Sequence, residues 1–370
     1  MEKTSAPVRH HDGGPVLTWG CLGKDSHDEL SHIALTRRVA NFLGKEYTGR
    51  LEDYRGSSRP YCVPRTTLCG AECSSHLTEV TEADFLGGRV GHPMAVTKAI
   101  VHPLAPDEEQ IPNWPASFAR AAADLTLSGF TAVTSRGAIG AGRKLLETGD
   151  VRIKLVSASG GTQQQVATSA YELLHIIDSL TNANGLVDCL VLEENLTNVK
   201  TFSVGQIVLG GVSAAYVGEQ KLTLNNEGQE VYGGSCLQVC RGSFSDCLDN
   251  LSGEDRKVCD LAMRFDNLAT RHLGLVASRR NYDVVSGRDG RGRVKHAVLE
   301  QSWRVGGASG AELSALEAFA RDPARQRVEA STVELYGENT VPPVNADVSF
   351  HGVDRELGPV LKYSYMQDGS

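Results

Sequence analysis

Apolar and polar residues alternate along the first part of the chain in a way that predicts short strands and one amphipathic helix. Residues 15–22 form an apolar run that is typical of a buried strand. Residues 28–44 place apolar side chains near a 3.6-residue period, which predicts a helix that ends at Gly44. A second short strand is expected around Tyr61, Cys62 and Val63. This order predicts a small α/β lobe.

The middle of the chain continues with alternating helices and strands. Helices are expected over residues 116–126, 135–147 and 168–180, and strands over residues 130–133, 151–156 and 189–192. From residue 201 the pattern changes to a hairpin, with strands at 201–209 and 212–218 around Gly210 and Gly211.

These changes of pattern predict three units in an α/β (α+β) protein. Residues 1–92 form the N-terminal lobe, and residues 93–330 form a central domain with a lid subdomain at about 125–192. Residues 331–370 follow, where Val333 and Leu335 indicate a strand before an irregular tail that begins at the prolines 342 and 343.

Composition restricts the class of protein. The chain has 370 residues, of which 41% are apolar and 22% charged, as in an ordinary globular protein. A formal net charge of −8 argues against a general nucleic-acid binder, and no apolar stretch approaches the roughly 20 residues that cross a bilayer. The start of the chain lacks the apolar segment of a signal peptide, so we expect a cytoplasmic protein without a membrane or nucleic-acid partner.

The nine cysteines are an odd number, which predicts reduced thiols rather than a disulfide framework. Cys236, Cys240, Cys247 and Cys259 lie close together, but zinc sites usually bring their ligands in closer pairs such as C-x2-C. Buried free thiols are therefore favoured over a structural metal site.

Two familiar nucleotide motifs are absent. The glycine-rich stretch from Gly137 to Lys144 lacks the phosphate-loop pattern, because Leu145 follows the lysine where serine or threonine is required. No G-x-G-x-x-G motif follows the first strand, which argues against a dinucleotide-binding dehydrogenase.

Two other segments have the residue types of a phosphate and purine site. Lys154 lies in a predicted strand before a turn that contains Gly160 and Gly161, so a point charge and exposed backbone N–H groups lie close to each other in sequence. The strand that ends in Glu193 and Glu194 could accept a hydrogen bond from an exocyclic amine or a ribose. Taken alone, each feature is also typical of a solvated surface.

A later hairpin gives the most specific signal. Its strands, 281–285 and 293–300, are joined by a glycine-rich loop. If the loop covers residues 289–292, Asp283 faces Val298 and Glu300 lies diagonally on the same face. Two carboxylates on one face are the arrangement by which proteins hold Mg²⁺ beside substrate phosphates, although two exposed acidic residues would give the same pattern.

The residues after this pair extend the predicted site. Alternation places Glu300, Ser302 and Arg304 on one side of the strand, which offers a carboxylate, a hydroxyl oxygen and a phosphate-binding guanidinium. A glycine-rich turn follows before a helix over residues 311–320, and its backbone N–H groups could bind an anion. The candidate loop residues are Gly306, Gly307, Ser309 and Gly310.

These segments, in this order, resemble the ATP-grasp superfamily. The family pattern has a strand lysine before a glycine-rich loop, an acidic hinge strand, an acidic residue and an E-x-N-x-R strand. Lys154 with Gly160 and Gly161 matches the first part, and the hinge corresponds to Glu193, Glu194, Asn195 and Leu196. Asp283 and the run from Glu300 to Arg304 match the metal-binding strands. The resemblance covers roughly residues 90–325.

Other stretches are similar to a bacterial ATP-grasp family labelled biotin carboxylase-like. They are residues 85–88, 97–100, 231–235 and 278–284. In such proteins an earlier lysine also contacts the phosphates, and by position Lys98 is the best match, with Lys144 behind it.

The resemblance implies an ATP-grasp fold with an N-terminal pre-ATP-grasp lobe. It also implies MgATP between two lobes, with Lys98, Lys154 and Arg304 on the phosphates and Asp283, Glu300 and Ser302 on Mg²⁺. The implied activity is an ATP-dependent ligase that activates a small carboxylate as an acylphosphate for an amine or similar nucleophile.

Two departures from the pattern limit what is carried over. Ser302 stands where the family has asparagine, and the loop after Gly161 is poorer in glycine than in a biotin carboxylase, so bicarbonate and biotin chemistry are not implied. A phosphotransferase on the same fold, or a nucleotide-binding protein without turnover, are the alternatives. The acid, the acceptor and the oligomeric state stay open, with a homodimer as one option.

Overall fold

The structure is a computed structural model that describes residues 13–20, 26–70, 80–108, 111–157, 164–181 and 186–367. Gly160 and Gly161 of the predicted phosphate loop lie outside the described residues.

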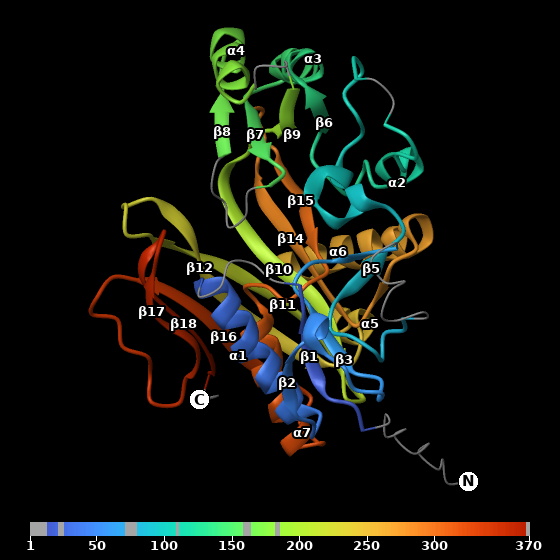
Figure 1. The fold of residues 1–370 in the computed structure, drawn as a ribbon. Coiled ribbons are helices and arrows are strands. Elements are labelled where there is room, and N and C mark those ends of the chain that lie inside the picture. The colour runs from blue at the N-terminus through green and yellow to red at the C-terminus, as the bar shows by residue number, and fades with distance from the viewer. Residues whose placement is uncertain are drawn as a thin grey trace.

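A three-stranded parallel sheet opens the fold. Strand β1 (Val16–Trp19) lies between β2 (Tyr47–Arg50) and β3 (Tyr61–Pro64). Helix α1 (His27–Phe42) connects β1 to β2, and the Ser26 hydroxyl caps its first turn by accepting from a backbone N–H. The helix packs its apolar side on this lobe and on the C-terminal half of the chain (Figure 1).

Short elements connect this lobe to the rest of the molecule. They are η1 (Leu51–Asp53), β4 (Leu68–Cys69), β5 (Gly88–Val90), η3 (Pro93–Val96), η4 (Lys98–Val101), α2 (Ala116–Ala121) and β13 (Val276–Ala277). Strands β4, β5 and β13 form a small sheet of their own.

A separate α/β unit occupies the stretch that the sequence assigns to the lid. Its four-stranded sheet has the order β6-β9-β7-β8, and helices α3 and α4 pack on it through a core of alanine, leucine, isoleucine and valine (Figure 1, green). The bounds are β6 Gly129–Thr134, α3 Ser135–Leu146, β7 Val151–Leu155, β8 Gln164–Ala167, α4 Ala170–Ser179 and β9 Leu186–Glu194.

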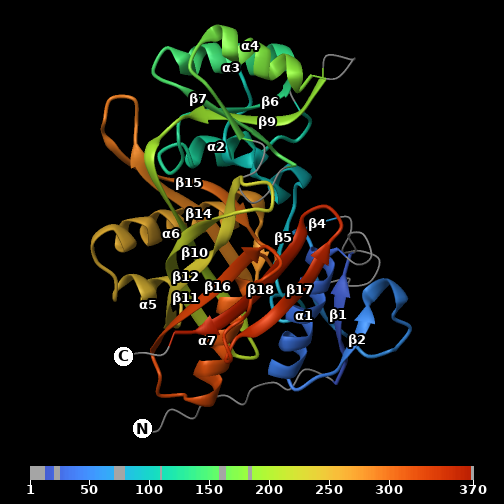
Figure 2. The same cartoon turned by 90° about the vertical axis from the view of Figure 1, so that its left-hand side faces the viewer.

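The largest element is an eight-stranded sheet with the order β15-β14-β10-β11-β12-β16-β18-β17 (Figure 2). All of its strand pairs are antiparallel. Its strands are β10 Thr197–Leu209, β11 Val212–Leu224, β12 Glu230–Arg241, β14 Arg279–Arg288, β15 Val294–Ser302, β16 Arg327–Tyr336, β17 Asp347–Asp354 and β18 Gly358–Met366.

Helices cover the two faces of this sheet differently. On one face, α5 (Phe244–Leu248) and α6 (Gly253–Leu273) pack on alternate residues such as Phe202 and Val204. On the other face, called the inner face here, α7 (Ser309–Arg321) and α1 pack on residues such as Ile207. The period of two along each strand therefore divides the sheet into two separate cores.

The C-terminal segment corrects one prediction. The sequence indicates an irregular tail after the prolines 342 and 343, but β17 and β18 follow them and complete the large sheet. The prolines lie in the connection between β16 and β17, where no ladder hydrogen bond is required. The predicted hairpin at residues 201–218 is confirmed, because Leu209 pairs with Val212 across the turn.

A buried ion pair joins the inner face of the sheet to α7. Arg279 on β14 is 1% exposed, and its Nη2 lies 2.7 Å from Oε1 of Glu312, which is also 1% exposed. The phenol of Tyr216 donates to the same carboxylate at 2.5 Å, and its oxygen lies 3.0 Å from Asn281 Oδ1. Because each charge is paired and hydrogen-bonded, the group tolerates burial.

Removing one partner of this pair should be costly. Arg279→Met leaves the Glu312 carboxylate buried without its cation, so we expect the free energy of unfolding in urea to fall by about 3–5 kcal/mol. The matched control is Arg264→Met, which breaks a 3.6 Å pair with Asp260 on the exposed side of α6 and should cost less than about 1 kcal/mol. Equal losses in the two variants would contradict the role given to the pair.

Candidate functional site

Two carboxylates oppose each other directly on the inner face of the large sheet. Asp283 on β14 pairs with Glu300 on β15, whereas the next pair is Val284 with Val298. The sequence predicts a diagonal arrangement, and the register shift corrects it. Leu299 is an extra residue on β15, and this bulge brings the acidic side chains opposite each other.

Two neutral amide donors of the described residues support Asp283. Gln220 Nε2 donates to Asp283 Oδ1 at 2.9 Å, and Asn281 Nδ2 donates to the same oxygen at 3.1 Å. Burial raises the pKa of Asp283 to about 7, and the negative charge of Glu300 acts in the same direction. A cation between the two carboxylates would relieve this repulsion.

One cation of the protein already reaches the pair. Lys98 Nζ on η4 lies 2.9 Å from Glu300 Oε2. The side chain of Gln301 fixes this segment to β15, because it donates to the carbonyl oxygens of Ala95 at 3.0 Å and Thr97 at 2.6 Å. The sequence offers Lys98, with Lys144 behind it, as the earlier lysine for the phosphates. Lys98 lies at the carboxylate pair, whereas Lys144 lies over the ring of Phe130 in the lid.

Ser302 and Arg304 follow Glu300 on the same side of the chain. The buried Arg279 holds this segment, because it donates to the carbonyl oxygen of Ser302 at 2.9 Å and to that of Arg304. Within the described ranges, the Arg304 guanidinium donates to its neighbour, the Val305 carbonyl, at 2.9 Å and to no other group. Burial lowers the pKa of Arg304, and so does the positive charge of Arg279.

The glycine-rich loop after Arg304 is packed closely on the sheet. A Cβ at Gly307 would meet the Tyr232 ring at 2.7 Å, and one at Gly310 would meet the Ser364 Cβ at 2.9 Å. The Ser309 hydroxyl accepts from the Gly306 N–H at 3.0 Å as α7 begins. Glycine is required here because a side chain would lift the loop off β12 and β18.

The predicted strand lysine lies in a second buried charge group. Lys154 Nζ on β7 is 2.5 Å from Glu193 Oε1, and His102 Nε2 is 3.3 Å from Glu193 Oε2. The charge of Lys154 and the hydrogen bond with His102 outweigh the effect of burial and lower the pKa of Glu193 to about 2. Lys154 is thus held at the hinge between the lid and η4.

The other hinge residues also have protein partners. Glu194 accepts from Lys295 Nζ at 2.6 Å and from the Ser128 N–H at 2.9 Å. The Asn195 side-chain oxygen accepts from Arg152 at 2.8 Å. Leu196 is buried in a small apolar cluster that contains Leu127, Val285 and Ala297, with Leu299 packed against it.

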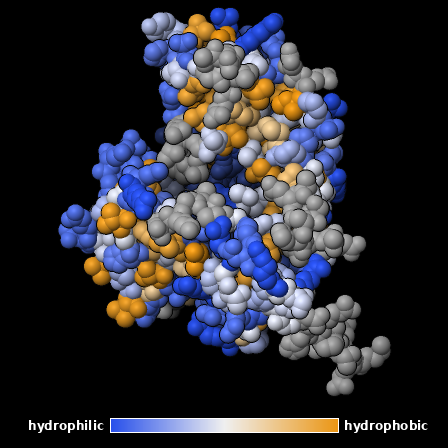
Figure 3. Space-filling model, viewed as in Figure 1, coloured by the Kyte–Doolittle hydropathy of each residue, from blue (hydrophilic) through white to orange (hydrophobic). Residues whose placement is uncertain are grey.

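A single short helix connects the two charge groups. The first residue of η4, Lys98, contacts Glu300, and the residue after its end, His102, contacts Glu193. Sequence reasoning missed His102, Gln220 and Asn281, since no local pattern distinguishes them from ordinary polar residues. Figure 3 shows a hydrophilic hollow between the lid and the body of the molecule, at the centre of the view.

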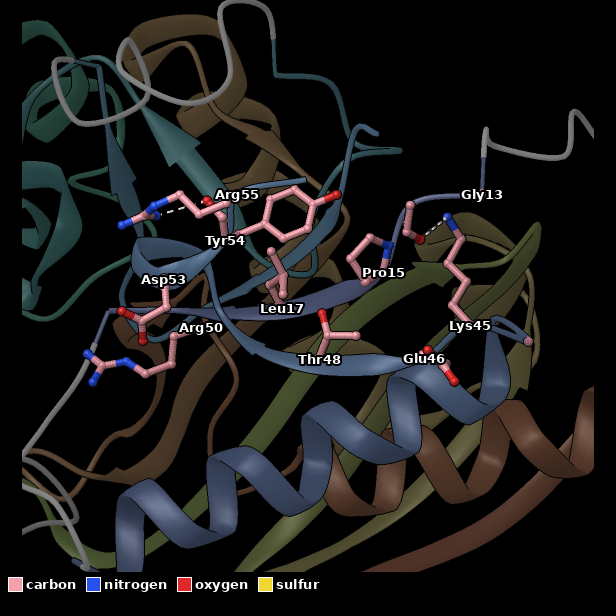
Figure 4. Close-up of a pocket in the computed structure, with 12 residues that line it drawn as sticks. Gly13, Pro15, Leu17, Lys45, Glu46, Thr48, Arg50, Asp53, Tyr54 and Arg55 are labelled. Carbon is pink, nitrogen blue, oxygen red and sulfur yellow. Dashed lines mark hydrogen bonds between the residues drawn. The ribbon is translucent and has the colours of Figure 1, made fainter. Parts of the chain in front are cut away.

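A cavity of about 540 Å³ lies elsewhere, in the N-terminal lobe (Figure 4). It is lined by β1, β2, the turn after α1 and the segment around η1, including Lys45, Arg50 and Asp53. None of the predicted site residues lines it.

Cys240, Cys247 and Cys259 are buried and free, whereas Cys236 is free but only partly buried. Nowhere in the described ranges are three or more His, Cys, Asp or Glu side chains arranged to hold a metal ion. Of the helices that the structure describes, none has both the length and the apolar character of a membrane span.

The fold is that of the ATP-grasp enzymes, which confirms the predicted fold class. The chain is similar to the biotin carboxylase domain of the Hydrogenobacter thermophilus 2-oxoglutarate carboxylase, in a structure with MgADP, ADP and bicarbonate. The two are 12% identical, with 96% of this chain and 87% of that chain covered and a TM-score of 0.55.

Two further solved structures agree. Phosphoribosylamine–glycine ligase from Thermotoga maritima is 14% identical, with coverage of 95% and 92% and a TM-score of 0.54. Carboxyaminoimidazole ribonucleotide synthase from Aspergillus clavatus, complexed with ATP, is 10% identical, with coverage of 95% and 94% and a TM-score of 0.51.

The chain itself belongs to the family described as protein of unknown function (DUF3182), whose model matches residues 21–364. A comparison with curated proteins found no match.

The buried charge group of Glu193, Lys154 and His102 makes the free energy of unfolding depend on pH. Because the pKa of Glu193 falls from 4.5 to about 2 on folding, its stabilisation is complete above pH 4.5 and is lost as the pH falls towards 2. In Lys154→Met the carboxylate loses its main partner. We expect this variant to be several kcal/mol less stable at pH 7, with the difference from wild type shrinking below pH 5.

Urea unfolding at pH 7, 5 and 4 measures this. The control is Lys200→Met, whose 3.8 Å pair with Glu254 is exposed and should matter little at any of the three pH values. A Lys154→Met deficit that does not change with pH would contradict the account.

Proposed function

We propose that the protein binds MgATP between the lid and the inner face of the large sheet and uses it to activate a carboxylate for ligation. The opposed carboxylates of Asp283 and Glu300 carry the proposal. They lie on the polar part of the inner face, and Lys98 and Arg304 supply cationic groups on the same side of the sheet.

The donors present fit a magnesium ion of this kind. Mg²⁺ is usually bound by one or two protein carboxylates and completes its coordination with phosphate oxygens and water. Asp283 and Glu300 are therefore sufficient as the protein ligands. Burial first, and then the charge of Glu300, raises the pKa of Asp283, and a bound cation would offset both effects. Asp283 and Glu300 would hold the ion, with Ser302 as a further oxygen, and the ion would neutralise charge on the transferring phosphoryl group.

The chain's own residues then have defined tasks. Lys98, already beside Glu300, is placed to contact the phosphates when they enter. Glu193 positions Lys154 at the hinge, and the Leu196 cluster offers an apolar surface for a purine ring. Arg304 and the loop of Gly306, Gly307, Ser309 and Gly310 follow Glu300 in the chain, and they would bind the carboxylate of the substrate acid.

The proposed reaction has two steps. A carboxylate oxygen of the substrate attacks the γ-phosphorus, the bond to the β-phosphate oxygen breaks, and ADP leaves. The amine then attacks the carbonyl carbon of the acylphosphate, inorganic phosphate leaves, and the amine loses a proton. Closure of the lid would exclude water, which would otherwise hydrolyse the intermediate.

An isotope experiment distinguishes this reaction from the alternatives. With an acid labelled with ¹⁸O in its carboxylate, turnover through an acylphosphate transfers one ¹⁸O atom to inorganic phosphate, and mass spectrometry of the phosphate detects it. ADP formation with a stable phosphate ester and no labelled phosphate would establish a phosphotransferase instead. Binding of MgATP without ADP formation for any acid and amine would favour a nucleotide-binding protein without turnover.

The metal assignment has its own test. Glu300→Gln keeps the shape of the side chain but removes one charge, so we expect acid-dependent ADP release to fall by at least about 100-fold while the circular dichroism spectrum is unchanged. Glu334→Gln, on a different strand of the same face, serves as the matched control for fold. Retained turnover in Glu300→Gln would contradict the assignment.

A further inference from the structure

The first helix and the last hairpin that the structure describes meet at one histidine. His27 is the first residue of α1, and Asp354, the last residue of β17, lies 327 positions further along the chain. Strand β17 is an edge strand of the large sheet, so β18 pairs with it on one side, and α1 packs against it (Figure 2). The contact between His27 and Asp354 therefore helps to hold a free edge of the sheet in place.

Both ring nitrogens of His27 lie at hydrogen-bond distance from a carboxylate. Nδ1 is 3.0 Å from Asp354 Oδ2, and Nε2 is 3.0 Å from Asp28 Oδ1. A neutral imidazole carries one N–H group, so it can donate to one of these oxygens and must turn a lone pair toward the other. The imidazolium form donates to both. The geometry is therefore that of a protonated histidine held between two carboxylates.

Asp354 is fixed by backbone groups on both sides of the contact. Its Oδ2 atom also accepts from the His27 backbone N–H at 2.9 Å, and its Oδ1 atom accepts from the N–H groups of Glu356 at 2.9 Å and Leu357 at 3.0 Å. Against the effect of burial, these hydrogen bonds lower the pKa of Asp354 below its usual range. Asp354 thus closes the turn between β17 and β18 and binds the first N–H of α1 at the same time.

Other charges near the ring oppose its protonation. Lys362 on β18 lies 3.5 Å from Asp28 and 3.1 Å from Glu334 on β16, and the N-terminus of α1 disfavours a positive charge at His27. The ring of Phe350 meets the His27 ring edge to face, with 6.1 Å between the centroids. Burial and the charge of Lys362 would lower the pKa of His27, but Asp28 and Asp354 outweigh them and raise it.

We propose that His27 is a pH-sensitive latch between α1 and the hairpin of β17 and β18. The imidazolium holds both carboxylates, which keeps the edge strand closed on α1. When the ring loses its proton, one nitrogen faces a carboxylate oxygen with no hydrogen between them, and that contact opens. The Asp28 side chain is 52% exposed and can turn into water, whereas Asp354 stays in its turn. The latch requires no nucleotide, so it stands apart from the proposed function.

The sign of the dependence follows from the raised pKa of His27. The stabilisation by the latch is complete below pH 6.5, the ordinary value for histidine, and it is lost as the pH rises through the higher value of the folded protein. The hydrogen bond with His27 lowers the pKa of Asp28 as well, so both carboxylates stay ionised between pH 5.5 and 8.5 in the tests below. Within the latch, the change over this range comes from the ring.

An NMR titration of the full chain tests the protonation of the ring. The His27 Cε1–H signal, assigned by its absence in His27→Gln, should titrate with a midpoint above pH 6.5. In Asp354→Asn the midpoint should be lower, because one of the two negative charges is gone. This variant keeps a side-chain oxygen for the N–H groups of Glu356 and Leu357, so the turn is preserved.

Hydrogen exchange of the amides in residues 347–354 tests the effect on the hairpin. In the wild type, we expect their protection factors to fall about tenfold between pH 5.5 and pH 8.5, because charge-assisted hydrogen bonds are replaced by weaker neutral ones. His27→Gln should show the lower protection at both pH values. His351→Gln, at an exposed position on the same strand, is the matched control and should keep the fall seen in the wild type.

Three outcomes would overturn the inference. They are a His27 ring that titrates at or below pH 6.5, protection of β17 that does not change with pH in the wild type, or a change that is equally large in His27→Gln. The first two are measured on the wild-type protein, so they decide the question even where a variant does not fold.

Discussion

The ion pair between Arg279 and Glu312 is the interaction on which the candidate site depends. It joins β14 to α7, and each partner also contacts a site segment. Arg279 donates to the carbonyl oxygens of Ser302 and Arg304, and Glu312 is connected through Tyr216 to Asn281. Asn281 in turn donates to Asp283. The carboxylate pair, the Arg304 strand and α7 therefore share one buried polar network, whose members depend on each other.

The two faces of the large sheet have different tasks. The face under α5 and α6 is an apolar core, with Tyr282 and Trp303 in edge-to-face contact. The inner face is apolar where α7 and α1 pack on it, and towards β15 it becomes a row of polar groups. Gln220, Ser203, Ser235 and Tyr232 form a hydrogen-bonded chain behind Asp283. A rigid polar surface of this kind costs stability but holds its groups in place before a ligand arrives.

Much of the fold follows from local patterns, and the remainder required tertiary contacts. The alternation in residues 201–218 and 281–300 predicts the hairpins, because their turns contain glycine and their strands have a clear period of two. The bulge at Leu299 was not predictable, because alternation continues through it and only the pairing reveals the extra residue. Strands β17 and β18 were missed because two prolines suggested a tail, although Phe350 and Leu361 are buried in the finished sheet. The sequence drew attention to Glu193, but its partner His102 lies 91 positions away and could not be paired with it from local patterns.

The most direct measurement of the central claim is calorimetric titration of the wild-type protein and of Asp283→Asn with a non-hydrolysable ATP analogue, with and without Mg²⁺. If the opposed carboxylates hold the ion, Mg²⁺ strengthens binding of the analogue at least about tenfold in the wild type, a difference of about 1.4 kcal/mol, and the strengthening disappears in the variant. Binding that is indifferent to Mg²⁺, or equally strengthened in Asp283→Asn, would contradict the claim that this pair is the magnesium site.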